Sequence, residues 1–161
     1  MRFLFVVSML VISMSVYSLE FEAGPSGGAG GTPFLDNPPS DYLQINSIKI
    51  CSGSVIDSIE TTYEDTSGNI YSYGRHGGGG GSCSTLFFWA GEYITTLSGK
   101  YASKIDSITI KTNFGRVLTK GGSGSIGVFN YTANAQFSIA GLKGRKGSII
   151  DAIGVVYFKT Y

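Results

Sequence analysis

Two short segments of this sequence repeat one pattern of glycine, serine and aspartate. They read Gly-Ser-Val-Ile-Asp at 53–57 and Gly-Ser-Ile-Ile-Asp at 147–151. A glycine followed by a tight turn can direct successive backbone N–H groups at one point, and the closing aspartate adds two strong acceptors. Such a site suits a polyol, because neighbouring hydroxyl groups both donate and accept. The alternative is that Asp57 and Asp151 cap their own turns.

A third segment and three glycine runs extend the repeat. Residues 102–106 read Ala-Ser-Lys-Ile-Asp, without the leading glycine, so we expect a degenerate third copy. The glycine runs are GGAGG at 27–31, GGGGG at 77–81 and GGSGS at 121–125. A flexible linker is the usual interpretation of such runs, but a linker would not recur between strands. We expect loops whose backbone closely approaches a ligand, although the first run also fits an N-terminal tail.

The rest of the chain has the alternation of β-strands. Ile59, Thr61 and Tyr63 alternate with more polar residues, and the same period of two recurs at 108–112 and 153–157. Helix signals are nearly absent. The short spacing of turn residues predicts an all-β sandwich, barrel or prism, and the threefold repeat favours three four-stranded sheets.

Residues 1–18 have the pattern of a signal peptide: Arg2, an apolar run, and small residues before a cleavage site. The run is short for a membrane span, which is the alternative. We therefore expect a secreted protein whose remaining residues, 19–161, form one domain. The formal net charge of +1 gives no general attraction to nucleic acid or to a membrane surface.

The chain has two cysteines, Cys51 and Cys83, and one histidine, His76. Two cysteines in a secreted chain are expected to form a disulfide. A metal site of both cysteines and His76 would be short of a ligand and has no usual spacing, so we expect no metal and no cofactor. A glycosidase needs two facing carboxylates, and Asp57 and Asp151 belong to separate repeats, so we do not expect a glycosidase. Asn130 begins an N-glycosylation sequon.

Several segments together resemble the jacalin-related lectins, in particular the mannose-binding type and the secreted zymogen-granule-type members. They are GPSGGAGGTPF near the N-terminus, GRHGGGGG followed by FFWAGEYITTLSGKY in the centre, and GLKGRKGSIIDAIGVVY near the C-terminus. The resemblance covers essentially all of residues 24–158. It implies a β-prism I fold, with three Greek-key sheets of four strands and pseudo-threefold symmetry, and carbohydrate binding without catalysis.

The resemblance also implies the residues of two sugar sites. The first uses backbone N–H groups of Gly31, Ser148 and Ile149 and the side chain of Asp151, with Gly147 shaping the turn. The second uses Gly81, Ser54, Val55 and Asp57, with Gly53 shaping the turn. A Cys51–Cys83 disulfide would then join the two loops of the second site.

Family features suggest which glycans bind. Galactose preference in the family accompanies a cut that frees an N-terminus at the position of Gly31, which here lies within a continuous stretch. The resemblance therefore favours mannose- or glucose-type glycans, bound by a homo-oligomer. Lys143, Arg145 and Lys146 crowd the first site, and basic residues there accompany anionic glycans in animal secretory members. An anionic or cell-wall polysaccharide is thus the alternative ligand, and a structural prism without sugar binding is a further alternative.

Overall fold

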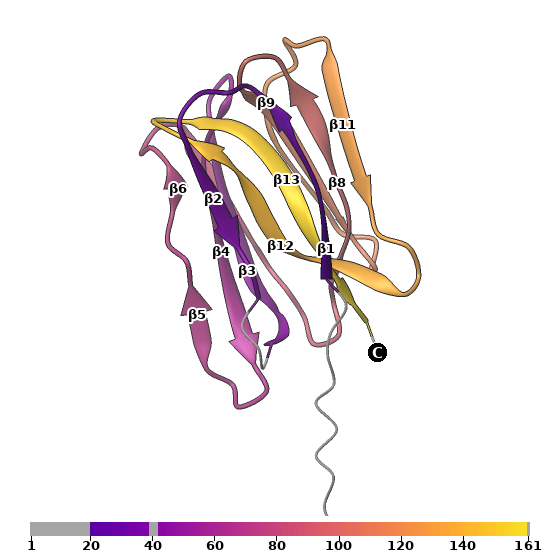
Figure 1. Ribbon diagram of the computed structural model, residues 1–161. Coiled ribbons are helices and arrows are strands. Elements are labelled where there is room, and N and C mark those ends of the chain that lie inside the picture. The colour runs from indigo at the N-terminus through magenta and orange to yellow at the C-terminus, as the bar shows by residue number, and fades with distance from the viewer. Residues whose placement is uncertain (1–19, 39–41, 161) are drawn as a thin grey trace, which may run out of the picture.

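The computed structural model describes residues 20–38 and 42–160, which form strands and loops (Figure 1). The predicted signal peptide, 1–18, lies outside the described residues. The all-β prediction is confirmed for the described part, in which every element is a strand. The strands are β1 (Glu20–Gly27), β2 (Thr32–Asp36), β3 (Tyr42–Ser52), β4 (Ile56–Asp65), β5 (Ile70–Ser72), β6 (His76–Gly77), β7 (Ser82–Phe87), β8 (Ile94–Tyr101), β9 (Ile105–Thr112), β10 (Val117–Gly121), β11 (Gly127–Thr132), β12 (Phe137–Lys146) and β13 (Ile150–Lys159).

Antiparallel pairing divides these strands into three similar groups. One group has the spatial order β7-β3-β4, with β5 and β6 both pairing the outer side of β4. A second has the order β11-β8-β9-β10. The third has the order β2-β12-β13-β1 and joins the two ends of the chain. In each group a central hairpin carries one of the three aspartates.

The expected three separate Greek-key sheets are found only in part. Within the β8–β11 group, the fourth strand lies beside the first, which is the Greek-key order. However, Ile139 of β12 pairs with Ile94 of β8, so two of the groups form one continuous sheet of eight strands. The remaining group is a sheet of five strands because its outer strand is interrupted between β5 and β6.

The buried face of each central hairpin supplies the core. Ile56, Ile105 and Ile150 begin β4, β9 and β13, and all three are fully buried. Buried and less buried residues alternate from Ile59 in β4 and from Ile108 in β9, as the period of two predicts, whereas β13 is buried on both faces from Ala152 to Tyr157. An aspartate follows each isoleucine directly and is the extra residue of a β-bulge, so it has no partner on the neighbouring strand and its side chain is only half-buried. The repeat thus places three carboxylates at equivalent positions on the outside of the prism.

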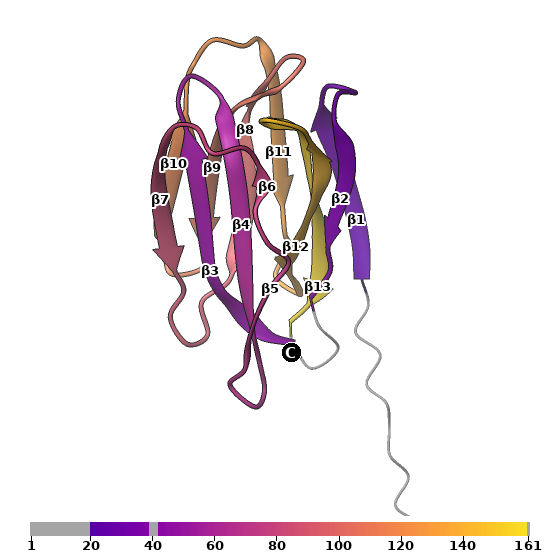
Figure 2. The same cartoon turned by 90° about the vertical axis from the view of Figure 1, so that its left-hand side faces the viewer.

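The molecule has two distinct ends. The three glycine runs and the three turns that precede the aspartates gather at the end that is uppermost in Figures 1 and 2. The first strand begins and the last strand finishes at the opposite end (Figure 1). Within the described residues, no helix is long and apolar enough to cross a membrane.

Candidate functional site

Three hairpin turns share one backbone geometry. They lie at the end of the prism where the glycine runs gather, which we call the loop end. We call them aspartate turn 1 (147–151), aspartate turn 2 (53–57) and aspartate turn 3 (102–106). In each, the N–H of the first residue donates to the carbonyl of the third: Gly147 to Ile149 at 3.0 Å, Gly53 to Val55 at 3.1 Å, and Ala102 to Lys104 at 3.0 Å. Replacement of glycine by Ala102 therefore leaves the turn itself unchanged.

Each aspartate turn is accompanied by one glycine run. We call these runs glycine loop 1 (27–31), glycine loop 2 (77–81) and glycine loop 3 (121–125). The N–H of the second glycine in each donates to the backbone carbonyl of the aspartate: Gly28 to Asp151, Gly78 to Asp57 and Gly122 to Asp106, at 2.8–2.9 Å. All three loops lie between strands. The prediction of matching loops is confirmed, and the tail interpretation of the first run is wrong.

Aspartate turn 1 and glycine loop 1 together form a candidate site, which we call site 1, and the glycine loop lies directly against the carboxylate of Asp151. A Cβ atom on Gly30 would lie 2.7 Å from Asp151 Oδ1, and one on Gly31 would lie 2.6 Å from Oδ2. Gly31 also has φ +63°, a conformation that glycine adopts without strain. Any side chain at these two positions would displace the carboxylate. The structure therefore brings Gly31, Gly147 and Asp151 together, with Ser148 and Ile149 in the same turn.

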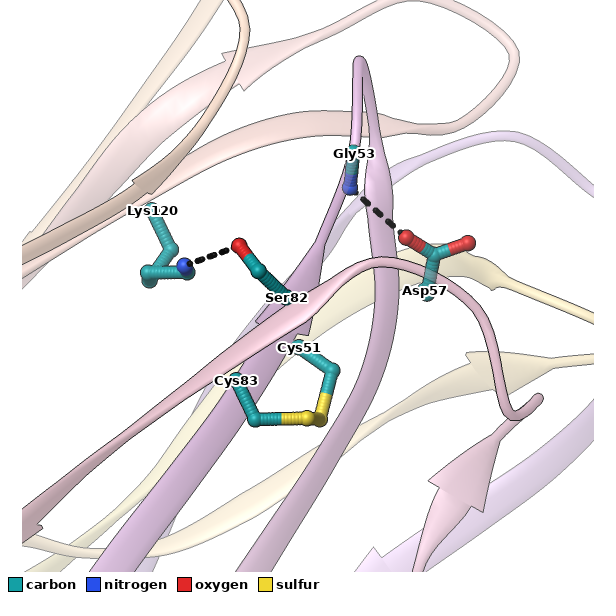
Figure 3. The surroundings of a disulfide bond; sticks show 6 residues. All are labelled: Cys51, Gly53, Asp57, Ser82, Cys83 and Lys120. Atoms are coloured by element: carbon teal, nitrogen blue, oxygen red, sulfur yellow. Dashed lines mark hydrogen bonds between the residues drawn. A yellow bond between two sulfur atoms is a disulfide. The ribbon is translucent and has the colours of Figure 1, made fainter.

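Site 2, which consists of aspartate turn 2 and glycine loop 2, has the same arrangement. A Cβ atom on Gly80 would lie 2.6 Å from Asp57 Oδ1, and one on Gly81, at φ +72°, would lie 2.5 Å from Oδ2. Figure 3 shows the Gly53 N–H donating to Asp57 Oδ2, at 2.8 Å. Asp57 thus caps its own turn, as the alternative to ligand binding predicted, and its carboxylate also faces glycine loop 2. A carboxylate has further lone pairs for a ligand, so the two roles are compatible.

The third repeat lacks the contact between loop and carboxylate. Gly124, the counterpart of Gly30 and Gly80, has no atom within 4 Å of where its Cβ would be. Ser125 stands where Gly31 and Gly81 adopt positive φ, and no described residue other than glycine has positive φ. A serine disfavours that conformation, so the end of glycine loop 3 does not close over Asp106.

Side chains at one repeated position hold the glycine loops in place. Arg145 lies two residues before aspartate turn 1 and donates from Nε to the Gly30 carbonyl at 2.8 Å and from Nη2 to the Gly31 carbonyl at 2.7 Å. Cys51, at the same position before turn 2, forms a disulfide with Cys83 (Figure 3). Lys100, at the same position before turn 3, donates to the Ser123 carbonyl at 3.3 Å.

The disulfide prediction is confirmed, and it excludes the metal site of two cysteines and a histidine. Cys51 and Cys83 are directly opposite each other on β3 and β7. Lys120 of β10 donates to Ser82 beside them, at 3.2 Å (Figure 3). In the part of the chain that the structure describes, no group of three His, Cys, Asp or Glu side chains could hold a metal ion.

His76 is a structural residue next to glycine loop 2. Its side chain is buried, stacks on Phe34 at 4.0 Å between ring centroids, and has Nε2 2.7 Å from Asp36 Oδ1. β2 follows glycine loop 1, and β6 leads into glycine loop 2. The buried contact of His76 with Phe34 and Asp36 therefore connects the strands that flank the two loops. Asn130, the sequon asparagine, is exposed on β11, where the structure does not test its modification.

Arg145, Gly30 and Gly80 are site residues that the sequence prediction missed or misread. The sequence associates Arg145, with Lys143 and Lys146, with anionic glycans. In the structure Arg145 donates to carbonyls of glycine loop 1, and Lys143 pairs with Glu22. Alignment of the three repeats with one another would have identified these residues. It places Arg145 and Cys51 at one position and Gly30 and Gly80 at another.

Comparison with known proteins identifies the family to which this architecture corresponds. Residues 23–156 match the Jacalin-like lectin domain. The chain belongs to this family of lectins. Horcolin of Hordeum vulgare is 34% identical over 85% of this chain and 96% of its own, and griffithsin of Griffithsia is 33% identical over 81% and 92%.

Solved structures of this family share the fold. The wild-type Malaysian banana lectin superposes with a TM-score of 0.78 at 33% identity, covering 87% of this chain and 99% of its own. A mannose-binding jacalin-related lectin from Ananas comosus superposes with a TM-score of 0.76 at 26% identity, covering 88% and 99%. The described strands are therefore those of a β-prism lectin.

Proposed function

We propose that this jacalin-like lectin is secreted and binds mannose- or glucose-type glycans, without catalysis, through sites 1 and 2. The observation that carries the proposal is the repeated contact between a half-buried carboxylate and a bare pair of glycines, at Asp151 with Gly30 and Gly31 and at Asp57 with Gly80 and Gly81. It leaves room for a pyranose ring to lie against the backbone.

The chemistry of each site fits two neighbouring hydroxyl groups. The carboxylate accepts from both hydroxyls, and backbone N–H groups of the turn and the glycine loop donate to hydroxyl or ring oxygens. For site 1 the proposed donors are the N–H groups of Gly31, Ser148 and Ile149. For site 2 they belong to Gly81, Ser54 and Val55. The mannose-binding relative from Ananas comosus supports this class of ligand.

Titration of the mature protein with methyl α-mannoside tests the proposal. We expect two sites per chain with affinity of about millimolar, or about −4 kcal/mol each. Asp151→Ala should leave only site 2, and Asp57→Ala only site 1, because a hydrogen bond to a charged group contributes roughly 1.5–3 kcal/mol. Asp106→Ala, in the third repeat, is the matched control and should leave both sites intact.

The alternative ligand, an anionic or cell-wall polysaccharide, predicts a different result. Of the three basic residues proposed for it, Arg145 donates to carbonyls of glycine loop 1 and Lys143 pairs with Glu22, which favours a neutral sugar. Binding of a neutral sugar should change little between low and high salt, whereas binding of a polyanion should weaken strongly. Absence of mannoside binding, together with salt-sensitive binding of a sulfated polysaccharide, would overturn the proposal.

Secretion and assembly complete the proposal. The apolar leader at 1–18 is the basis for secretion, and mass spectrometry of exported protein should find Leu19 at its N-terminus. Two weak sites on one chain, and more in a homo-oligomer, would raise the overall affinity for a glycan that several sites bind at once. Light scattering of the purified protein measures the oligomeric state, and a monomer would contradict this part of the proposal.

A further inference from the structure

The second glycine of each glycine loop touches the turn of a different repeat. A Cβ atom on Gly78, in site 2, would lie 2.3 Å from the carbonyl oxygen of Ser148, in site 1. A Cβ atom on Gly122, in the third repeat, would lie 2.6 Å from the carbonyl oxygen of Ser54, in site 2. Gly28 of site 1 stands in the same way 2.2 Å from the Ser103 carbonyl oxygen of the third repeat. The three contacts form a closed ring around the loop end of the prism.

Two of the three contacted carbonyls, those of Ser148 and Ser54, belong to peptide groups with a role in the proposed sites. The Ser148 carbonyl is in one plane with the N–H of Ile149, and the Ser54 carbonyl with the N–H of Val55. Both peptides are trans, since the cis bond of the described residues is Gly24–Pro25. In a trans peptide the carbonyl and the N–H point in opposite directions. The N–H groups of Ile149 and Val55 therefore point away from the glycine that contacts the carbonyl of the same peptide.

We infer that Gly122 and Gly78 are positioning residues for sugar sites to which they do not belong. Gly122 fixes the peptide that donates from Val55 in site 2, and Gly78 fixes the peptide that donates from Ile149 in site 1. This inference rests on the proposed function, because it concerns the donors of sites 1 and 2. It also gives glycine loop 3 a role, although that loop does not close over Asp106.

The backbone at these glycines permits a clean test. Neither Gly78 nor Gly122 has positive φ, so alanine can adopt their conformation without strain. The added Cβ must instead displace the serine carbonyl, because contacts below 3.0 Å do not persist. Since the peptide is rigid, that displacement tilts the donor N–H on its other side. The effect reaches the adjacent site through one peptide group.

The experiment compares Gly122→Ala with Gly124→Ala by titration with methyl α-mannoside and by amide NMR. Gly124 lies in the same loop with open space around it. For Gly122→Ala we expect the affinity of site 2 to fall about tenfold, the effect of losing one hydrogen bond. Site 1 should be unchanged, and in the sugar-free protein the Val55 amide resonance should shift while that of Ile149 does not. Gly124→Ala should alter none of these.

A second pair of variants covers the case in which Gly122→Ala does not fold. Gly78→Ala should weaken site 1 and shift the Ile149 amide. Gly79→Ala, whose nearest neighbour is an Arg75 nitrogen at 4.0 Å, should leave site 1 unchanged. Measurement in an Asp57→Ala background isolates site 1, because Gly78 also belongs to the loop of site 2.

The results separate this inference from the proposed function. If the unsubstituted protein binds no mannoside, the proposed function fails. If it binds at two sites and Gly122→Ala leaves site 2 and the Val55 amide unchanged, the inference is wrong and the proposed function stands. A drop in melting temperature with equal loss at both sites would show a general structural role for Gly122 and would also overturn the inference.

Discussion

Arg145 and Cys51 occupy the same place in two copies of one structural unit, yet they hold their glycine loops by different chemistry. Arg145 binds the carbonyls of Gly30 and Gly31 by two hydrogen bonds, whereas Cys51 joins β3 to β7 covalently just beyond Gly81. Sites 1 and 2 otherwise share their turn, their carboxylate and their pair of glycines. The comparison shows that the same loop is held in place by two hydrogen bonds in one repeat and by a covalent bond in the other.

Lys100 completes the comparison as the weakest of the three attachments. Its single bond to the Ser123 carbonyl, at 3.3 Å, is exposed, and glycine loop 3 leaves Asp106 uncovered. The two glycine loops with stronger attachments close over their aspartates, and the loop with the weakest attachment does not. Substitutions at the three positions test whether that relation has consequences for binding.

Removal of the disulfide should have the largest effect. The double variant Cys51→Ser, Cys83→Ser should lower the free energy of unfolding by about 2–4 kcal/mol, because the unfolded chain gains conformational freedom. Site 2 should weaken while site 1 keeps its affinity. Denaturant unfolding and mannoside titration measure the two effects, and the same result is expected after reduction of the unsubstituted protein. Equal weakening of both sites would contradict the local role assigned to the disulfide.

Substitution of Arg145 should have an intermediate effect, confined to site 1. Arg145→Lys keeps the charge but cannot donate to two carbonyls in the fork geometry of a guanidinium. Loss of one such bond should weaken site 1 about tenfold, with site 2 unchanged. Lys143→Ala is the control on the same strand. If Lys143→Ala weakened binding as much as Arg145→Lys, the effect would come from positive charge near the site and not from the loop attachment.

Substitution of Lys100 should have the smallest effect. Exposed polar contacts of this kind contribute about 0–1 kcal/mol, so Lys100→Ala should change the unfolding free energy by less than about 0.5 kcal/mol. We expect both mannoside affinities to stay within about twofold of the unsubstituted protein. A loss at site 2 comparable to that of the disulfide variant would show that Lys100 supports glycine loop 3 more strongly than its geometry indicates.

The repeat in the sequence predicted the parts of the structure that depend on local pattern. Alternating apolar residues predicted the strands, and the repeated Ile-Asp pair marked Asp57, Asp106 and Asp151 as equivalent positions. The β-bulge at each aspartate was not predicted, although it keeps the carboxylate off the buried face that the next isoleucine occupies. Two cysteines in a chain with an apolar leader predicted the disulfide. The strands and the repeat depend on residue types within a few positions of one another, whereas the disulfide follows from there being two cysteines in the chain.

Other parts depend on how distant segments meet, which local pattern does not contain. The bonds from Arg145 to glycine loop 1 join opposite ends of the chain, and so does the pairing of β12 with β2. The Ile139–Ile94 pair that merges two groups into one sheet is a single contact. The contact of Gly78 with the Ser148 carbonyl arises only after three repeats close into a ring. The sequence singles out Arg145 by its charge, but only the fold shows that its guanidinium donates to the carbonyls of Gly30 and Gly31.

The arrangement of the two ends of the prism has a practical consequence. The described chain starts and finishes at the end opposite the glycine loops (Figure 1). A tag, a tether to a surface or a fused partner at either terminus would therefore lie far from the loops and leave them facing outward. An array of copies anchored in this way would present the glycine loops of every copy in one direction.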